Sequence, residues 1–550
     1  MTTGCRHDLY PRRETTIEES LVKIGAALVL LLLVHALAPA QTFPVDDPVI
    51  RRIWTEAVDS SQLPVLAHQL LDVIGPRLVG TPQMVKANTW VLEKYRGWGI
   101  GGTNEQYGTW RGWERGVSHI DLLQPRVRTL EGTMLAWSPP TKKGGVTAPL
   151  VILGDNPDSA AFVRWLPSVR DKFVLVSPPQ PTGRPDRNWE EYATKESFDS
   201  LKALRERIKS GWESRVKASG VKGDTLQLLL ERAGAAGVIT CEWSSGWGVY
   251  RVFGTKTLRI PAVTLSLEDY NLLFRLVEHG DNPLVRIETV SKNLDSLPAC
   301  NTLGTMRGST LPRQYVILSA HLDSWDGASG ATDNGTGTLI MMEAMRVLRK
   351  CYMAPRRTIL AGHWGSEEQG LNGSRAFVKD HPEIVDSLQV LFNQDNGTGR
   401  ITSIGGGGLV NVPGNVARWL SRLPGEVTEN LKMSYPGRPA GGGTDNASFA
   451  GAGVPALGVG SLNWDYFSYT WHTNRDTYDK LVFDELKNNV VLVACLAYLA
   501  SEDPAFLSRE RRVLPPDKKT GKPGEWPIPE EPERRGGLPR APETDPERNP

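Results

Sequence analysis

Apolar and polar positions alternate regularly along the second half of the chain. Short apolar runs at 315–320, 357–362 and 388–392 predict buried strands. Amphipathic stretches at 337–350, 370–378 and 482–501 predict the helices that separate and follow them. Strands that alternate with helices indicate a mostly parallel sheet. The predicted fold class is therefore α/β, with a mostly parallel, mixed sheet sandwiched by helices.

The pattern differs in the first half of the chain. Residues 46–75 and 83–97 predict helices, joined by a loop at 74–82 that glycine and proline punctuate. Between about 130 and 290 the apolar runs are short and read as strands, at 150–153, 173–176, 238–241, 262–265 and 284–288, with one long charged helix at 195–217. This pattern of short strands predicts a separate β-rich domain.

These patterns divide the chain into five parts. Residues 41–130 and 296–507 are assigned to one α/β domain, and residues 131–295 to a β-rich domain inserted in it. Residues 508–550 are dominated by Pro, Gly, Glu and Arg, which predicts a disordered tail. Residues 1–40 are assigned to a signal peptide.

The signal peptide is predicted from a basic residue, an apolar run and small residues. Lys23 precedes the run 24–38, and the pair Ala38 and Ala40 indicates cleavage before Gln41. The run is about 15 residues long, short of the roughly 20 that a spanning helix needs, although a retained anchor stays an alternative. We therefore expect an exported protein, periplasmic or secreted, with no stable membrane insertion after cleavage.

Composition narrows the function classes. Of 550 residues, 40% are hydrophobic and 23% charged, as in ordinary globular proteins, and the net charge of +1 argues against a nucleic-acid partner. Of the five cysteines, Cys5 lies in the predicted leader, and the other four form no CxxC pattern. They are interpreted as buried free thiols, with one or two disulfides of open pairing as the alternative.

Six metal-binding side-chain types stand where a predicted strand or tight loop ends. In parallel sheets, ligands gather beyond the carboxyl ends of the strands. Imidazole and carboxylate groups hold divalent cations, and a hydrolytic site also needs a spare carboxylate as base. Each residue alone also fits an ordinary loop, helix cap or turn. The six residues are His321, Asp333, Glu367, Glu368, Asp395 and His472.

Two further aspartates stand close in sequence to the histidines. Asp323 lies two residues after His321, and Asp476 lies four residues after His472. A carboxylate of this kind would fix the tautomer of a histidine ligand. His363, near the glutamates, is interpreted as structural.

Together these motifs resemble the co-catalytic di-zinc exopeptidases, which include bacterial leucyl aminopeptidases and glutamate carboxypeptidases. The resemblance is closest to plasma glutamate carboxypeptidase-like proteins. It implies a phosphorylase/hydrolase-like zinc peptidase domain. It spans most of residues 70–500 and rests on 321–324, 333–337, 367–370, Asp395 and 472–477, with further similarity at 74–82 and 443–449.

The resemblance implies two Zn²⁺ ions. His321 and Asp395 would hold one ion, Glu368 and His472 the other, and Asp333 would bridge them. Cobalt or manganese would suit the same ligands. Glu367 would be the general base that takes a proton from a water shared by the two ions. Asp323 and Asp476 would support the ligands, and the family places a cis peptide after the bridging aspartate, here Asp333–Asn334.

The chain departs from the family at the substrate cleft. Relatives often carry histidine at Asn446, so Asp445 and Asn446 are only weak candidates for substrate binding. Some relatives bind the oxyanion with a tyrosine where this chain has Trp471; Tyr466 or Tyr469 would substitute. The inserted domain resembles the protease-associated domain at 233–239 and 259–265, which covers the cleft without taking part in the chemistry.

The function predicted from these residues is an exported metallo-exopeptidase. It would hydrolyse terminal bonds of short peptides or dipeptides, with aminopeptidase or dipeptidase activity favoured. A carboxypeptidase of the plasma glutamate carboxypeptidase type and a glutaminyl cyclase are the alternatives. A non-enzymatic scaffold would lack ligands, and none is missing. The expected partner is a short peptide, no nucleic acid is expected, and homodimer formation stays open.

Overall fold

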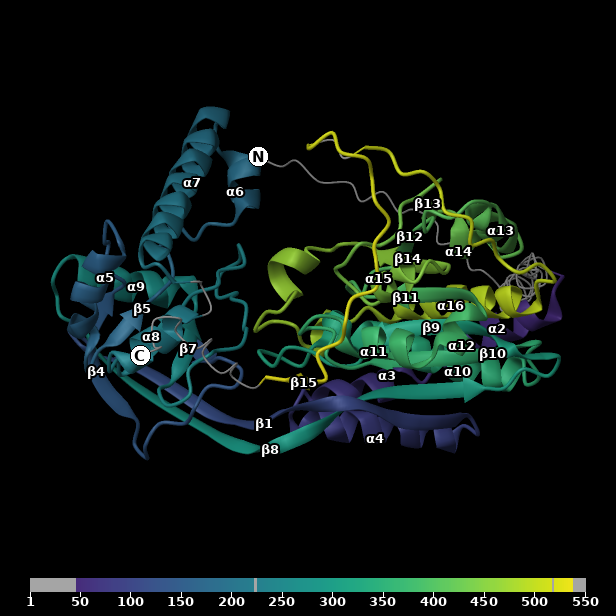
Figure 1. The fold of residues 1–550 in the computed structure, drawn as a ribbon, viewed down its shortest axis with the longest axis horizontal. Helices are drawn as coiled ribbons and strands as arrows, with labels where there is room; N and C mark the ends of the chain where they lie inside the picture. Colours follow the sequence, from purple (N-terminus) through teal and green to yellow (C-terminus); the bar gives the residue numbers. More distant parts are fainter. Residues whose placement is uncertain (1–45, 222–224, 517–518, 538–550) are drawn as a thin grey trace, which may run out of the picture. The chain divides into compact units, whose positions relative to one another are not determined.

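The computed structural model describes residues 46–221, 225–516 and 519–537 (Figure 1). The predicted signal peptide at 1–40 lies outside these residues. Among the helices of the described ranges, none combines the length and the apolar character needed to cross a bilayer.

The main sheet carries the repeated pattern of the second half of the chain. Its strand order is β13-β12-β14-β11-β9-β10-β8. Strands β9, β10, β11 and β14 are parallel, whereas β8 runs antiparallel to β10. Strand β12 runs antiparallel to β14 and parallel to β13. The strands are β8 (Leu284–Met306), β9 (Leu311–His321), β10 (Arg357–Trp364), β11 (Leu388–Gln394), β12 (Ile401–Ile404), β13 (Lys432–Met433) and β14 (Ala456–Ser461). The prediction of a mixed α/β sheet is confirmed.

Helices flank this sheet (Figure 1). Every residue of β10 and β11 is buried, because helices cover the sheet and leave no face for water. Helices α2 (Pro48–Asp59), α10 (Thr336–Cys351) and α16 (Phe483–Glu502) pack together, and α10 and α16 contact β9 and β10. Four further helices contact strands of the sheet: α4 (Pro82–Gly97), α11 (Asn372–Asp380), α12 (Pro382–Asp386) and α15 (Asn446–Gly451). Helices α13 (Val412–Leu420) and α14 (Gly425–Thr428) contact α16.

The helix expected at 46–75 is divided. It consists of α2, α3 (Leu63–Ala67) and the π-helical turn η1 (His68–Ile74). The cause lies at Pro64, because a proline has no backbone N–H and its ring clashes with the carbonyl four residues earlier, at Ser60, where α2 ends. Proline is tolerated in the first turn, so a new helix begins there.

A long ribbon leads from the main sheet to a smaller sheet. Strand β1 (Gly101–Gln124) pairs antiparallel with β8 along its length. The smaller sheet has the order β4-β5-β6-β7-β3, and β4 also pairs with β8. Its strands are β3 (Gly132–Met134), β4 (Val146–Ile152), β5 (Phe173–Leu175), β6 (Gly237–Thr240) and β7 (Ala262–Leu265). Strand β2 (Arg128–Thr129) pairs with the end of β1.

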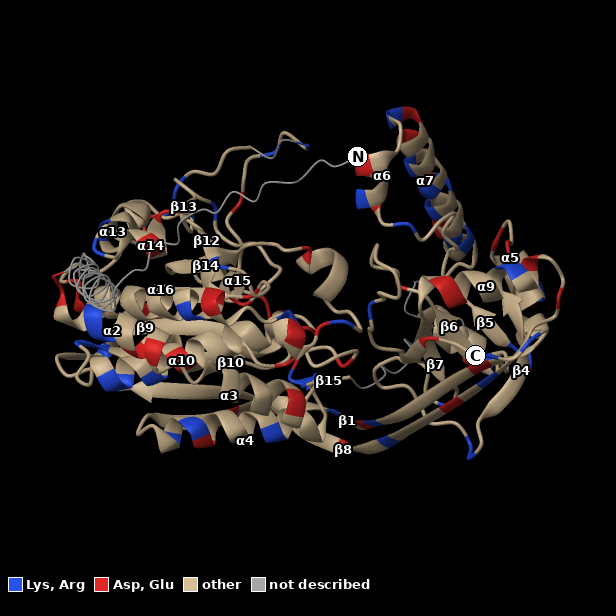
Figure 2. Cartoon of the chain, turned by 180° about the vertical axis from the view of Figure 1, so that it is seen from behind, with Lys and Arg blue, Asp and Glu red and all other residues tan. Residues whose placement is uncertain are grey.

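Residues 131–295, here the inserted region, contain this smaller sheet and more helix than the sequence pattern indicated. Helix α7 (Lys195–Ala218) is the predicted long charged helix, and Figure 2 shows acidic and basic residues along it. Four shorter helices accompany it: α5 (Ser159–Trp165), α6 (Asp186–Tyr192), α8 (Leu226–Arg232) and α9 (Leu267–Glu278). The strand predicted at 284–288 belongs to β8, so the ribbon joins both sheets. The boundaries of the inserted region and its protease-associated character stay predictions.

The expected disordered tail needs correction within the described residues. Residues 508–516 and 519–537, here the C-terminal strap, run along the folded surface, as the yellow trace in Figure 1 shows. Glu530 pairs with Arg375 at 2.5 Å, and Glu533 N donates to Asn372 Oδ1 at 2.7 Å. Strand β15 (Arg535–Gly536) pairs with β1. A proline-rich segment without its own core is thus held by ion pairs and backbone pairing.

The four cysteines in the described part of the chain are free thiols. Cys241, Cys351 and Cys495 are buried, and Cys300 is half-buried. Burial raises the pKa of Cys300 to about 11, because a thiolate is disfavoured away from water. The interpretation as free thiols is confirmed.

Candidate metal centre and active site

The six predicted residues meet at the carboxyl ends of the central strands. His321 is the last residue of β9, the glutamate pair follows β10, and Asp395 follows β11. Because these strands are parallel and adjacent, their ends meet at one edge of the sheet. Asp333 arrives from the turn η4 (Ala331–Gly335) before α10, and His472 from the loop after the turn η5 (Tyr466–Thr470).

The ligand atoms form two groups that share Asp333. In each of the two groups, the atoms lie within 4.8 Å of one another. His321 Nε2 is 3.0 Å from Asp395 Oδ1 and 3.4 Å from Asp333 Oδ1. His472 Nε2 is 2.8 Å from Glu368 Oε2 and 3.3 Å from Asp333 Oδ2. The two oxygens of Asp333 therefore face different histidines, as a bridging carboxylate would.

The chemistry of these donors fits divalent cations. Glu368 Oε1 and His472 Nδ1 are buried, and the described residues offer them no hydrogen-bond partner. Burying several carboxylates together is costly unless positive charge offsets them. Two histidine nitrogens with carboxylate oxygens are a donor set suited to Zn²⁺ and related cations. These residues therefore fit divalent cations bound at this position.

Glu367 belongs to neither ligand group. Its Oε2 lies 4.0 Å from His321 Nε2, close to the centre. Burial raises the pKa of Glu367 well above its usual value, although His321 opposes the shift, and the charges of Asp395 and Asp445 raise it further. A carboxylate with a raised pKa beside the reacting groups is suited to accept a proton. The geometry is compatible with the predicted general base.

Burial also governs the pKa of the ligands. The pKa of Glu368 is raised to about 7 by burial first and then by Asp333, against the opposing charge of His472. Burial lowers the pKa of His472, but Glu368 and Asp333 more than offset this and raise it to about 10. The Glu368 carboxylate and the His472 imidazole therefore attract one another strongly.

Asp323 supports both sides of the centre. Its carboxylate accepts hydrogen bonds from Glu367 N at 3.1 Å and Glu368 N at 3.3 Å. Its backbone oxygen accepts from His321 Nδ1 at 3.0 Å. The carbonyl thus orients the histidine, while the carboxylate positions the glutamates.

Asp476 does not orient His472, which corrects the expectation from the sequence. Its carboxylate accepts from Thr332 N at 2.7 Å and Asp333 N at 3.0 Å. Residues four apart face one another in a helix, but this segment is a loop, so the spacing brings no contact. Asp476 instead holds the backbone that carries Asp333. The Asp333–Asn334 peptide is cis, as predicted.

The weak substrate-binding candidates fall into two places. Asp445 precedes α15 and is fully buried, and Asn446 is buried beside it; neither oxygen of the Asp445 carboxylate has a hydrogen-bond partner among the described residues. Tyr466 is 5% exposed, whereas Tyr469 is 37% exposed. Burial raises the pKa of Tyr466 well above its usual value, and the charges of nearby metal-ligand carboxylates add to this. Tyr466 is therefore the more deeply buried of the two tyrosines.

His363 lies away from the ligand groups. It is buried, and its Nε2 is 2.6 Å from the hydroxyl of Tyr95. Burial lowers its pKa to about 3. The contacts agree with the structural role predicted from the sequence.

Arg77 is a supporting residue that the sequence reasoning missed. Its guanidinium is buried and donates to the carbonyls of Leu322 at 2.7 Å, Ser329 at 2.7 Å and Gly330 at 2.8 Å. It therefore holds the loop between His321 and the turn that carries Asp333. The available signal was its position inside the loop 74–82, which the family resemblance covered.

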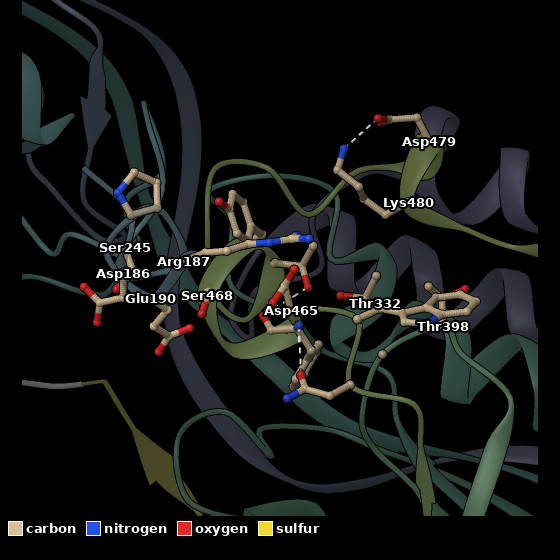
Figure 3. Close-up of a pocket in the computed structure, with 17 residues that line it drawn as sticks. Asp186, Arg187, Glu190, Ser245, Thr332, Thr398, Asp465, Ser468, Asp479 and Lys480 are labelled. Carbon is tan, nitrogen blue, oxygen red and sulfur yellow. Dashed lines mark hydrogen bonds and ion pairs between the residues drawn. The ribbon is translucent and has the colours of Figure 1, made fainter. Parts of the chain in front are cut away.

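A cavity of about 740 Å³ adjoins the centre. Thr332, Gly397 and Tyr466 line it on the side of the ligand groups. The opposite side comes from α6, and Figure 3 shows Arg187 extending into the cavity toward the side that carries Asp465. Its lining also includes Glu190, Lys480 and Trp464.

The flanked α/β sheet, with its paired histidine and carboxylate groups, belongs to a metallopeptidase. Residues 301–497 match the model of Peptidase family M28.

Known relatives resemble most of the chain. Carboxypeptidase Q of Mus musculus is 24% identical over 442 residues, which cover 80% of this chain and 86% of that protein. Carboxypeptidase Q of Bos taurus is 25% identical over 443 residues, covering 80% of this chain and 85% of that protein.

Two solved structures share the fold. A peptidase M28 precursor from Shewanella amazonensis SB2B has a TM-score of 0.62 at 24% identity, covering 85% of this chain and 98% of that chain. The zinc aminopeptidase from Bacillus subtilis has a TM-score of 0.52 at 19% identity, covering 83% and 96%.

Proposed function

We propose that this metallopeptidase is a two-zinc exopeptidase that removes terminal residues from short peptides or dipeptides. The observation that carries the proposal is the sharing of Asp333 by two ligand groups, with Glu367 left over beside them. His321 and Asp395 would hold one Zn²⁺, and Glu368 and His472 the other. Export through residues 1–40 is part of the proposal and rests on the sequence alone.

The bound zinc, Glu367 and Tyr466 would each have a different role in hydrolysis. When bound, zinc supplies Lewis acidity that polarises the scissile carbonyl and acidifies the attacking water. Glu367 accepts the proton of that water and returns it to the leaving amine. The hydroxyl of Tyr466 lies in a buried position from which it would donate to the developing oxyanion.

The adjoining cavity supports a short substrate. Its volume of about 740 Å³ lies within the usual range of small-ligand pockets, about 300–1,000 Å³. Its lining carries both signs of charge, because Arg187 and Lys480 line it together with Asp186, Glu190, Asp465 and Asp479, and Lys480 pairs with Asp479. A short peptide with both termini free offers the complementary charges, which favours dipeptidase or aminopeptidase activity.

Carboxypeptidase activity is the second candidate. It is supported by the relatives named carboxypeptidase Q, which match 80% of this chain. The two candidates differ in the terminus that must be free. Dipeptides, amino-terminally acetylated peptides and carboxyl-terminally amidated peptides therefore separate them.

Glu367→Gln tests the proposed mechanism on this panel. We expect kcat to fall by about 10²- to 10⁴-fold, because the amide cannot accept the proton. The zinc content of the variant should equal that of the wild type, since Glu367 lies outside the ligand groups. Glu383→Gln, at an exposed glutamate of α12, is the matched control. Wild-type turnover in the Glu367 variant would refute the assignment of the base.

A further inference from the structure

The inserted region touches the loop that carries His472. Residues 248–253, here the clamp segment, run antiparallel beside that loop. Val252 N donates to the backbone oxygen of His472 at 2.9 Å, and Asn474 N donates to that of Tyr250 at 3.0 Å. The backbone of a metal-ligand candidate is thus hydrogen-bonded to the inserted region.

Side chains fasten the same junction. Asn474 Oδ1 accepts from Tyr250 N at 3.1 Å, and Asn474 Nδ2 donates to Gly248 O at 3.0 Å. Arg475 Nη2 donates to Gly248 O at 3.1 Å and to Glu131 Oε1 at 2.6 Å. Because Asn474 bonds the clamp segment in both directions, it fixes the register between the two stretches of chain.

Aromatic rings enclose the imidazole of His472. The ring of Phe253, the last residue of the clamp segment, meets it edge-on at a centroid distance of 5.3 Å. Trp471 stacks on it at 3.9 Å, and Trp325 lies at 6.1 Å. The guanidinium of Arg251 in turn covers the ring of Trp471 at 4.9 Å. The clamp segment therefore bears on both the backbone and the ring of the histidine.

The two histidines differ in what else supports them. His321 ends a strand paired on both sides, and its Nδ1 is held by the carbonyl of Asp323 at 3.0 Å. His472 stands in a loop with φ of 60°, and its Nδ1 has no hydrogen-bond partner among the described residues. Metal ligands need a supporting shell to hold their orientation. For His472, much of that shell comes from outside the main sheet.

We propose that the clamp segment positions His472, so that the metal position of Glu368 and His472 depends on the inserted region. The position of His321 and Asp395 does not depend on it. Asn474 and Phe253 are positioning residues that act through His472. This inference rests on the proposed two-metal centre and gives the inserted region a part in building it, beyond covering a cleft.

Titration of the metal-free full-length chain with Co²⁺, followed by calorimetry and visible absorption, tests the inference. His472→Ala and His321→Ala identify which binding step belongs to which position. In Asn474→Ala, we expect the affinity of the His472 step to fall by about 10- to 100-fold, as for other residues that orient metal ligands. The His321 step should stay unchanged. Phe253→Leu should act in the same direction through the ring contact.

A variant far from the clamp segment serves as the control. Asn415→Ala removes a half-buried asparagine of α13 whose side chain bonds only locally, to Asn411 O and Arg418, and should leave both steps unchanged. Thermal unfolding confirms that each variant is folded. If Asn474→Ala and Phe253→Leu bind both ions as the wild type does, or lose both steps equally, this inference is overturned while the two-metal proposal stands. A wild-type chain that takes up one ion only would overturn the two-metal proposal and this inference with it.

Discussion

Two buried histidines on neighbouring strands show how surroundings decide the role of a residue. His363 lies one residue before the end of β10 and His321 ends β9. His321 faces Asp333, Asp395 and Glu367, and these carboxylates raise its pKa well above the usual value although burial opposes them. His363 meets a tyrosine hydroxyl and no carboxylate. Burial alone then favours its neutral form.

The buried His363 predicts a pH dependence of stability. Its pKa is about 3 in the folded protein, against 6.5 for an ordinary histidine. As pH falls below about 6.5, the unfolded chain gains a proton that the folded chain does not, so the free energy of unfolding falls. His363→Gln has no such group. At pH 5 the wild type should have lost about 2 kcal/mol more than the variant, relative to pH 7.

Urea unfolding at pH 7, 6 and 5 measures this difference. His279→Gln, at an exposed histidine after α9, should follow the wild-type slope. Parallel pH profiles of the wild type and His363→Gln would contradict the prediction.

Residue types, their places at the ends of strands and loops, and the family resemblance together pointed to six residues that the structure brings close to one another. Their positions follow from local patterns, because a strand, a turn and a helix start are each encoded by adjacent residues. Arg77 and the target of Asp476 could not be predicted in this way. Both depend on hydrogen bonds to backbone groups far away in the sequence, and no local pattern reports such partners.

At the scale of elements, the C-terminal strap is the clearest departure from the sequence pattern. Its composition is that of a segment unable to form a core. It gains order by completing another element: β15 pairs with β1, and Gly536 lies directly against the ring of Trp110. Trp110 is only 4% exposed. A glycine is required there, because an added Cβ would overlap the indole.

Removal of the C-terminal strap should destabilise the protein. A chain that ends at Arg512 would expose Trp110 and break the ion pair of Glu530 with Arg375. We expect the free energy of unfolding to fall by about 2–3 kcal/mol, since exposing one large apolar side chain costs about 1.5–3 kcal/mol. Urea unfolding of this chain, compared with one that ends at Gly537, measures the effect. Equal stability of the two chains would show that the strap contributes nothing.

At the scale of the whole molecule, the proposed metals and the fold support one another. The centre joins three strand ends, the turn η4 and a loop bonded to the inserted region. Cations that bind the assembled centre stabilise the folded state over the unfolded chain. The metal-free protein, in contrast, keeps several carboxylates buried together, which opposes folding.

Removal of metal should therefore lower the melting temperature. With free zinc at a hundredfold excess over its dissociation constant, the stabilisation from one site is about 2.7 kcal/mol. Thermal unfolding with chelator, and after zinc is restored, measures the shift. Asp333→Asn, which weakens both ligand groups, should show a smaller shift than the wild type. Identical melting curves with and without chelator would contradict the prediction.

The sequence by itself determined the α/β class, the strand ends that carry chemistry, and the six side chains of the centre. These depend on residue type and on periodicities within one segment, which neighbouring residues encode. Only the tertiary structure decided which oxygen of Asp333 faces which histidine, that Tyr466 rather than Tyr469 is buried, and that the clamp segment and the C-terminal strap pack where they do. Such contacts join residues far apart along the chain, and their geometry exists only once the strands and loops have packed together.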